Sequence, residues 1–191
     1  MNYQELLVDA SKQLKSYKFN SAKLDAELIL SKTLGLSRET ILLNLNEKIN
    51  DKVLENFNYY LKLRKQNKPI AHILGFKDFW KYKFKVDKNV LIPRPETELI
   101  IEQALKILPK LSNKNILDIG TGSGCIIISI IKERENCKAT GIDKSLKALK
   151  VAKLNAEMHQ VQKKIKFLNI DVDKYFANKY DDNITASMTY E

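Results

Sequence analysis

The chain has 191 residues, 44% hydrophobic and 29% charged, which is an ordinary globular composition. Its net charge of +10 favours acidic partners, but the lysines are scattered as on a solvated surface, so charge alone does not indicate nucleic-acid binding. The sequence shows no signal peptide, no membrane-spanning run and only two cysteines without metal-ligand spacing. These features predict a cytoplasmic protein with neither a membrane segment nor a metal site.

The first seventy or so residues predict a bundle of amphipathic helices, because apolar residues recur at helical spacing. We expect Ser21 and Ser37 to cap the second and third helices, Gly35 to end the second, and Asp51 to start a fourth that ends before Pro69. The expected buried positions are Leu6, Leu7, Ala10 and Leu14, then Leu24, Leu28 and Leu34, then Ile41 and Leu42, then Val53, Phe57, Tyr60 and Leu61.

From Trp80 the pattern changes to strict alternation. Four apolar residues (Trp80, Tyr82, Phe84 and Val86) alternate with charged ones, which predicts a strand with one buried face. A turn at 87–89 would return the chain as a second strand at 90–92. The aromatic row either packs against a helix or offers bases a stacking surface.

Two prolines then make a stiff, charged connector, Pro93–Glu98, ahead of a helix that opens at Pro95 or Thr97. We expect that helix to bury Leu99, Ile100, Ala104, Leu105 and Leu108. A rigid charged connector is unusual for a plain linker, so we expect it to place Arg94 and Glu96 near a site.

A glycine loop, Gly120–Gly124, follows a short buried strand at 115–117 and precedes a strongly apolar helix from Cys125. Glycine lets backbone turn tightly and approach a ligand, and the helix N-terminus offers free N–H groups. The spacing is D-x-G-x-G-x-G, which differs from the dinucleotide fingerprint and from the Walker loop.

Asp143 lies nineteen residues after Gly124, at the end of a second apolar run, where a carboxylate can accept both ribose hydroxyls. Ser145 is expected to cap the next helix, and a third strand at 165–170 ends at Asp171. The Asp171 carboxylate either faces an adenine amino group or caps a turn. The loop and Asp143 together resemble the S-adenosylmethionine site of Rossmann-like methyltransferases.

Three stretches resemble one family: PIAHILGFKDF at 69–79, VLIPRPETE at 90–98 and LDIGTGSGC at 117–125. They are similar to the bacterial release factor glutamine N5-methyltransferases, and the resemblance extends to about Phe176. The second stretch is the specific one. The related enzyme for a ribosomal protein glutamine differs after its Pro-Arg, and nucleic-acid methyltransferases generally lack the stretch.

The resemblance implies an α/β fold in three parts. These are a helical substrate-recognition bundle at 1–75, a β-hairpin and proline connector at 76–95, and a partial Rossmann-like class I methyltransferase domain at 96–191. The family transfers a methyl group from S-adenosylmethionine to the side-chain amide nitrogen of the glutamine in the Gly-Gly-Gln motif of class I release factors. Carried over by position, the cofactor-binding residues are Gly120, Thr121, Gly122, Ser123, Gly124, Asp143 for the ribose and Asp171 near the adenine.

The Asn-Pro-Pro-Tyr motif that holds the acceptor amide in the family is absent, so we assign no catalytic residue. We expect the domain to be truncated after its third strand, with a disordered or weak edge tail from Asn178. The first strand would then lack one neighbour. The expected consequences are marginal stability or association through that edge, weakened cofactor binding and negligible methyl transfer.

The resemblance implies class I release factors as partners, a monomeric chain unless the sheet edge associates, and no direct contact with membrane or nucleic acid. Two alternatives stay open. One is a non-catalytic remnant that binds release factor. The other is a nucleic-acid methyltransferase, which would show a basic stripe and salt-dependent RNA binding.

Overall fold

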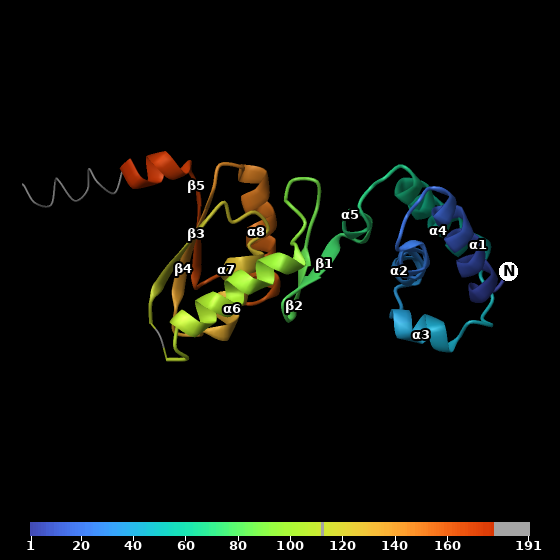
Figure 1. Cartoon of the computed structure of the whole chain (residues 1–191), viewed down its shortest axis with the longest axis horizontal. Helices are drawn as coiled ribbons and strands as arrows, with labels where there is room; N and C mark the ends of the chain where they lie inside the picture. Colours follow the sequence, from blue (N-terminus) through green and yellow to red (C-terminus); the bar gives the residue numbers. More distant parts are fainter. Residues whose placement is uncertain (112, 178–191) are drawn as a thin grey trace, which may run out of the picture. The chain divides into compact units, whose positions relative to one another are not determined.

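The computed structural model describes residues 1–111 and 113–177, and the tail expected from Asn178 lies outside the described residues. The chain divides into two compact units, Met1–Gly75 and Phe76–Glu191. Figure 1 colours the first from blue to teal and the described part of the second from green to red. Across these described residues, none of the helices is both long and apolar enough to cross a lipid bilayer.

The first unit is entirely helical in its regular structure, as its sequence periodicity predicts. Its elements are α1 (Tyr3–Ser16), α2 (Ala22–Leu34), α3 (Arg38–Leu43), α4 (Asp51–Lys65) and α5 (Ile70–Leu74). Short polar side chains begin several of them: Ser37 Oγ accepts the Thr40 N–H at 3.1 Å, and Asn50 Oδ1 accepts the Val53 N–H at 2.9 Å. The core contains the expected Leu6, Ala10 and Leu14, together with the expected Ile41, Phe57 and Leu61.

The buried face of α2 differs in part from the prediction, although Leu34 packs against the core as expected. Leu24 is 43% exposed, and the residues that enter the core are Ala22, Ala26, Ile29 and Leu30, with the carboxylates of Asp25 and Glu27 beside them. Ser21 does not cap the helix through its side chain; its hydroxyl donates to Asp25 Oδ1 at 3.0 Å. The helix turns this face inward because arginine side chains elsewhere in the unit neutralise both carboxylates.

The second unit starts with an antiparallel hairpin, β1 (Phe76–Phe79) and β2 (Tyr82–Lys85), with Trp80 and Lys81 at its turn. The predicted pairing with residues 90–92 is wrong, because that segment is in no strand and β2 pairs with the residues before it. The Phe79 and Phe84 rings meet edge to face at 6.1 Å and are almost fully buried. The hairpin thus turns its aromatic side into the core of this unit.

The connector forms a 3-10 turn, η1 (Pro95–Thr97), and then α6 (Glu98–Ile107). The helix is confirmed, but its predicted face is partly wrong: Leu99 and Ile100 are 59% and 54% exposed, whereas Ile101 is fully buried. The later predicted positions, Ala104, Leu105 and Leu108, do pack against the core.

The rest of the described chain alternates strands and helices, as the sequence predicts. These elements are β3 (Asn115–Ile119), α7 (Cys125–Glu133), β4 (Lys138–Asp143), α8 (Leu146–Met158) and β5 (Ile165–Asn169). The three strands are parallel in the order β3-β4-β5, so β3 pairs with β4 alone among the described strands. This Rossmann-like α/β arrangement brings the carboxyl ends of all three strands to one edge of the sheet.

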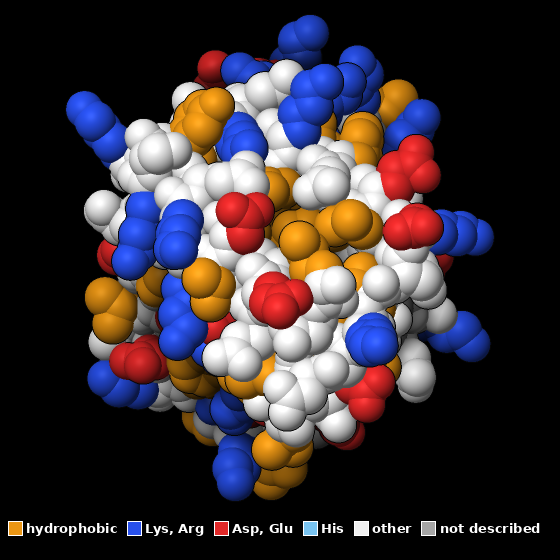
Figure 2. Space-filling model, turned by 90° about the vertical axis from the view of Figure 1, so that its right-hand side faces the viewer, with side chains coloured by type: hydrophobic (Ala, Val, Ile, Leu, Met, Phe, Trp, Pro, Cys, Tyr) orange, Lys and Arg blue, Asp and Glu red, His pale blue; other side chains and the backbone are white. Residues whose placement is uncertain are grey.

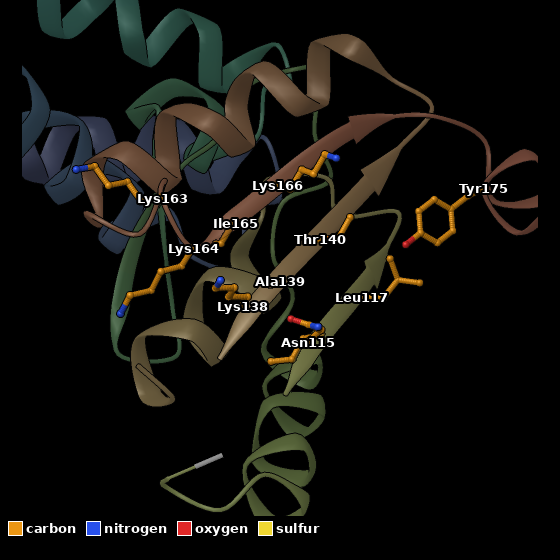
Figure 3. Close-up of a pocket in the computed structure, with 11 residues that line it drawn as sticks. Asn115, Leu117, Lys138, Ala139, Thr140, Lys163, Lys164, Ile165, Lys166 and Tyr175 are labelled. Atoms are coloured by element: carbon orange, nitrogen blue, oxygen red, sulfur yellow. The ribbon is translucent and has the colours of Figure 1, made fainter. Parts of the chain in front are cut away.

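The two faces of this sheet are covered unequally. Apolar residues of α6 and α7 share one core with residues of β4, β5 and the hairpin. The face in Figure 3 carries a cavity of about 630 Å³, lined in part by Leu117, Thr140, Lys138 and Lys166, with the Tyr175 ring lying beside Leu117.

On the face of the molecule drawn in Figure 2, Lys and Arg side chains are scattered among acidic ones and form no single stripe.

Candidate functional site

The loop between β3 and α7 has a backbone that demands glycine. Gly120, Gly122 and Gly124 have φ values of 72°, 55° and 78°, in the left-handed region that other residues rarely adopt. A Cβ at Gly124 would lie 2.9 Å from Ile128 Cδ1 and 3.3 Å from Ala152 Cβ, so a side chain there would also force its neighbours to shift. At Gly120 a Cβ would meet nothing within 4 Å, which leaves open space beside the backbone.

Backbone hydrogen bonds attach this loop to the neighbouring strand. The N–H groups of Gly120 and Thr121 both donate to the carbonyl oxygen of Ile142, at 2.9 and 3.0 Å. The Gly124 N–H donates to the Thr121 carbonyl at 2.8 Å, closing the turn into α7. The Thr121 and Ser123 side chains are 6% and 3% exposed, so the loop offers a ligand its backbone rather than these hydroxyls.

Asp143, at the end of β4, reaches into the same loop. Its Oδ2 accepts the Gly122 N–H at 3.0 Å, and its Oδ1 accepts the Ser145 N–H at 2.8 Å. A carboxylate has about four acceptor positions, so roughly two stay available for hydroxyl groups. The two bonds hold the carboxylate at the strand end.

A cavity of about 360 Å³ opens where the three parallel strands end. Its lining comes from the end of β3 and the residue after it (Ile119 and Gly120), from the end of β4 and the residue after it (Ile142, Asp143 and Lys144), and from the residues after β5 (Ile170, Asp171 and Val172). Ligands of open parallel sheets bind in this position, outside the carboxyl ends of the strands. The fold therefore brings Gly120, Asp143 and Asp171 together, although 51 residues separate the first from the last.

The other expected site residues have different surroundings. Gly122 joins the site through its bond to Asp143, whereas Thr121, Ser123 and Gly124 do not line the cavity. Asp171 is exposed, and its Oδ1 accepts the Asp173 N–H at 3.0 Å at the start of a helical turn. Arg94 and Glu96 are both exposed on the connector and also do not line the cavity.

Two further groups near this site, the Asp118 carboxylate and the Ser145 backbone N–H, were not among the site residues predicted from the sequence. Asp118 Oδ2 accepts the Thr121 hydroxyl at 2.7 Å. Burial raises the pKa of the Asp118 carboxyl, the Thr121 hydrogen bond opposes this, and the nearby Asp143 charge adds to the increase. The acid that opens D-x-G-x-G-x-G and the Asp-x-Ser spacing at 143–145 are the signals that would have identified them.

The Cys125 thiol beside the loop is not activated for reaction. Burial raises the pKa of the Cys125 thiol to about 11, so it stays protonated and is a poor nucleophile. Within residues 1–111 and 113–177, no group of three or more His, Cys, Asp or Glu side chains is placed to hold a metal ion. The Asp143 carboxylate and the open space beside Gly120 are suited to binding a polar ligand with hydroxyl groups.

Comparison with known proteins shows which families the chain resembles. Residues 5–75 match the family model described as the PrmC N-terminal domain, and residues 110–187 match one described as a methyltransferase domain. The release factor glutamine methyltransferase of Caulobacter vibrioides is 39% identical over 147 residues, which is 77% of this chain and 51% of that protein.

Two further curated relatives carry the same name. The Coxiella burnetii protein is 38% identical and the match covers 85% of this chain and 58% of that one; the Escherichia coli K12 protein is 36% identical over 90% and 60%. The chain thus spans about half to three fifths of the length of these relatives. Among solved structures, a Geobacter sulfurreducens SAM-dependent methyltransferase crystallised with S-adenosyl-L-homocysteine matches 41% of this chain and 30% of that chain, at 31% identity and a TM-score of 0.34.

Proposed function

We propose that this chain, which belongs to the family of release factor glutamine methyltransferases, provides the binding sites for the partner and for the cofactor of that activity. The reaction is S-adenosylmethionine-dependent methylation of the glutamine side-chain amide in the Gly-Gly-Gln motif of class I release factors. The site is the cavity at the strand ends, and Asp143 is the residue on which binding depends most. Because release factors work on ribosomes, the reaction belongs to the cytoplasm.

The observation that carries the proposal is the pairing of Gly122 and Asp143 beside the cavity. The carboxylate already accepts two backbone N–H groups and keeps about two acceptor positions for a vicinal diol such as a ribose. The open space next to Gly120 lets a ligand approach the backbone closely. These features fit the nucleoside of S-adenosylmethionine, which supplies the methyl group when bound.

The roles of the residues follow from their positions. Asp143 holds the ribose hydroxyls, the Gly120 backbone forms the wall beside them, and Gly122 bonds to the Asp143 carboxylate. Asp171 uses one oxygen for the Asp173 N–H and has the other free to accept an adenine amino group. Together they bind and orient the methyl donor and exclude water from one side of it.

The acceptor side of the reaction is demanding, because the lone pair of an amide nitrogen is delocalised into its carbonyl. Catalysis must then come from in-line positioning and from acceptors aimed at the NH₂ group. The sequence contains no Asn-Pro-Pro-Tyr run, so we assign none of its residues to that role. The exposed Arg94 and Glu96 are candidates for contacts with the protein substrate.

The helical unit is proposed to grip the release factor. It matches the N-terminal family model over nearly its whole length. In it, a groove of about 430 Å³ is lined by apolar Leu7, Val8 and Leu42 and by lysines including Lys12 and Lys15, which suits a surface with apolar and acidic groups. The chain is proposed to act as a monomer that contacts neither membrane nor nucleic acid directly.

The decisive experiment is calorimetric titration of the chain with S-adenosylmethionine and S-adenosyl-L-homocysteine. We expect measurable binding to the unmodified chain and at least tenfold weaker binding to Asp143→Asn, which keeps the shape but removes the charge and one acceptor. Glu102→Gln, at an exposed position on α6, is the matched control and should bind within twofold of the unmodified chain. Undiminished affinity in Asp143→Asn, or no binding to the unmodified chain, would refute the site.

A second titration, with a class I release factor, separates the two halves of the proposal. Release-factor binding with cofactor binding supports the full assignment. Release-factor binding without cofactor binding would support the alternative that the chain is a non-catalytic remnant that binds release factor. RNA binding that weakens steeply with salt, without release-factor binding, would instead identify a nucleic-acid methyltransferase.

A further inference from the structure

A fully buried asparagine on α8 connects the glycine loop to the hairpin. Asn155 has no exposed surface. Its Nδ2 donates to the Ser123 carbonyl at 2.8 Å and to the Lys85 carbonyl at 3.0 Å, and its Oδ1 accepts the Lys85 N–H at 2.7 Å. One side chain thus bonds both backbone groups of a β2 residue and one backbone group of the loop.

The bond to Ser123 acts on a particular peptide unit. The Ser123 C=O and the Gly124 N–H belong to the same planar group. Asn155 holds its oxygen, and the Thr121 carbonyl accepts its N–H at 2.8 Å. Rotation of this unit would break both bonds, so the two contacts together retain the positive φ of Gly124 at the start of α7.

No other residue type reproduces this set of bonds at the same length. An asparagine amide has two N–H donors and one carbonyl acceptor, and here both donors and the acceptor are used. Aspartate would keep the bond from the Lys85 N–H but, when ionised, would face two carbonyl oxygens with no proton to donate. Leucine has a similar volume and loses all three bonds.

We propose that Asn155 is a positioning residue, which keeps the Gly122–Gly124 backbone in its ligand-ready conformation by tying Ser123 to β2. This proposal rests on the proposed function in one respect, which is that the loop is the one assigned to the cofactor. Because Gly122 bonds to Asp143, a loop released from Asn155 also loosens the carboxylate at the cavity. The hairpin and the cofactor loop are therefore mechanically coupled through one amide.

The same helix offers controls that separate positioning from general stability. His159, the residue directly after α8, bonds through Nε2 to the Lys83 carbonyl at 2.9 Å and contacts the Tyr82 and Phe84 rings. His159→Ala therefore removes contacts to the hairpin without removing a hydrogen bond to the loop. Val151 is 4% exposed, and Val151→Ala removes buried apolar volume from α8 without removing a side-chain hydrogen bond.

The test compares amide hydrogen exchange, residue by residue, in Asn155→Asp, Asn155→Leu and the two controls, well below each unfolding temperature. We expect the Gly124 amide to exchange at least tenfold faster in both Asn155 variants than in Val151→Ala or His159→Ala. The Lys85 amide should lose protection in Asn155→Leu but keep most of it in Asn155→Asp. Equal loop exchange in the Asn155 variants and the controls would overturn the proposal.

Cofactor affinity is measured on the same proteins as a separate readout. Asn155→Asp is expected to bind S-adenosyl-L-homocysteine at least tenfold more weakly, and both controls within twofold of the unmodified chain. Fast loop exchange without cofactor binding by the unmodified chain would uphold the positioning role and refute the proposed function. Fast loop exchange with unchanged affinity would overturn the link between Asn155 and the ligand-ready loop.

Discussion

The helical unit has two buried carboxylates and the α/β unit has two half-buried ones, and the two units hold these acids differently. In the helical unit, Asp25 lies 2.7 Å from Arg64 Nε, and Glu27 lies 2.6 Å from Arg38 Nε. In the α/β unit, Asp118 is bonded to a hydroxyl and Asp143 to two backbone N–H groups. Among the described residues, neither of these two acids forms an ion pair.

This difference separates charges that are balanced inside the fold from charges that are available to the proposed ligand. An acid paired with arginine has its charge balanced inside the fold, and its removal mainly affects stability. An acid held by neutral donors at the edge of a cavity keeps acceptor capacity for a ligand, at the expense of stability in the unliganded protein. The arginine-paired acids lie on α2, and the unpaired ones lie at the carboxyl ends of β3 and β4.

The largest expected effect is the loss of Arg64. Arg64→Ala would leave the Asp25 carboxylate, which is 1% exposed, without its cation, and should lower the free energy of unfolding by about 3–5 kcal/mol. Urea unfolding followed by circular dichroism at 222 nm measures this. The double variant Arg64→Met, Asp25→Leu should recover most of the loss, since no unpaired charge remains. A loss below about 1 kcal/mol in Arg64→Ala would contradict the structural role of the pair.

The next largest effect is expected at a glycine, and it is measured by comparing one glycine from each unit. Gly124→Ala should lower the free energy of unfolding by about 2–5 kcal/mol, because the left-handed backbone penalty adds to crowding against Ile128 and Ala152. Gly35→Ala, at a similar φ of 68° but with nothing within 4 Å, should lose only about 1–2 kcal/mol. Equal losses in urea unfolding would show that the loop is not tightly packed on α8.

The smallest effect concerns pH. The pKa of Asp118 is raised in the folded protein, mainly by burial, so the folded chain holds this proton more tightly than the unfolded chain. Its contribution therefore favours folding below the unfolded pKa and is lost as pH rises towards the folded value. Asp118→Asn keeps an acceptor for Thr121 and removes this dependence.

The stability of Asp118→Asn relative to the unmodified chain should accordingly increase as pH rises through the unfolded pKa of an aspartate and level off above the raised pKa of Asp118 in the folded chain. Urea midpoints across that range measure the difference. Glu102→Gln, at an exposed site, should show no such trend. A relative stability of Asp118→Asn that falls with pH would mean that the fold stabilises the Asp118 charge, contrary to the effect of its burial.

Much of the fold was predictable because it is encoded locally. The strand–loop–helix at Asn115–Glu133 follows from apolar runs that flank glycines at fixed spacing, and the Ser37 and Ser145 caps follow from residues at most three positions away. The convergence of Gly120, Asp143 and Asp171 was predictable too, since parallel strands end at one edge of a sheet. In each case the deciding interaction is short in sequence or imposed by the topology.

The predictions were wrong where a residue distant in the sequence determines the local structure. The hairpin partner of β2 was misplaced because the alternation is equally compatible with strands on either side, and burial of Phe79 against Phe84 selects one. The buried face of α2 was missed because leucine spacing outweighed two acids, whose arginine partners lie 11 and 39 positions away. Asn155 was missed for the same reason.

By itself the sequence determined the order of helices and strands, the glycine loop and the family, because periodicity, turn residues and motif spacing are properties of neighbouring residues. Tertiary structure alone decided which acids are neutralised, which strand completes the hairpin and which side chain holds the loop. Asn155 bonds residues 32 and 70 positions away, and only the packing of α8 against both brings them within hydrogen-bonding distance.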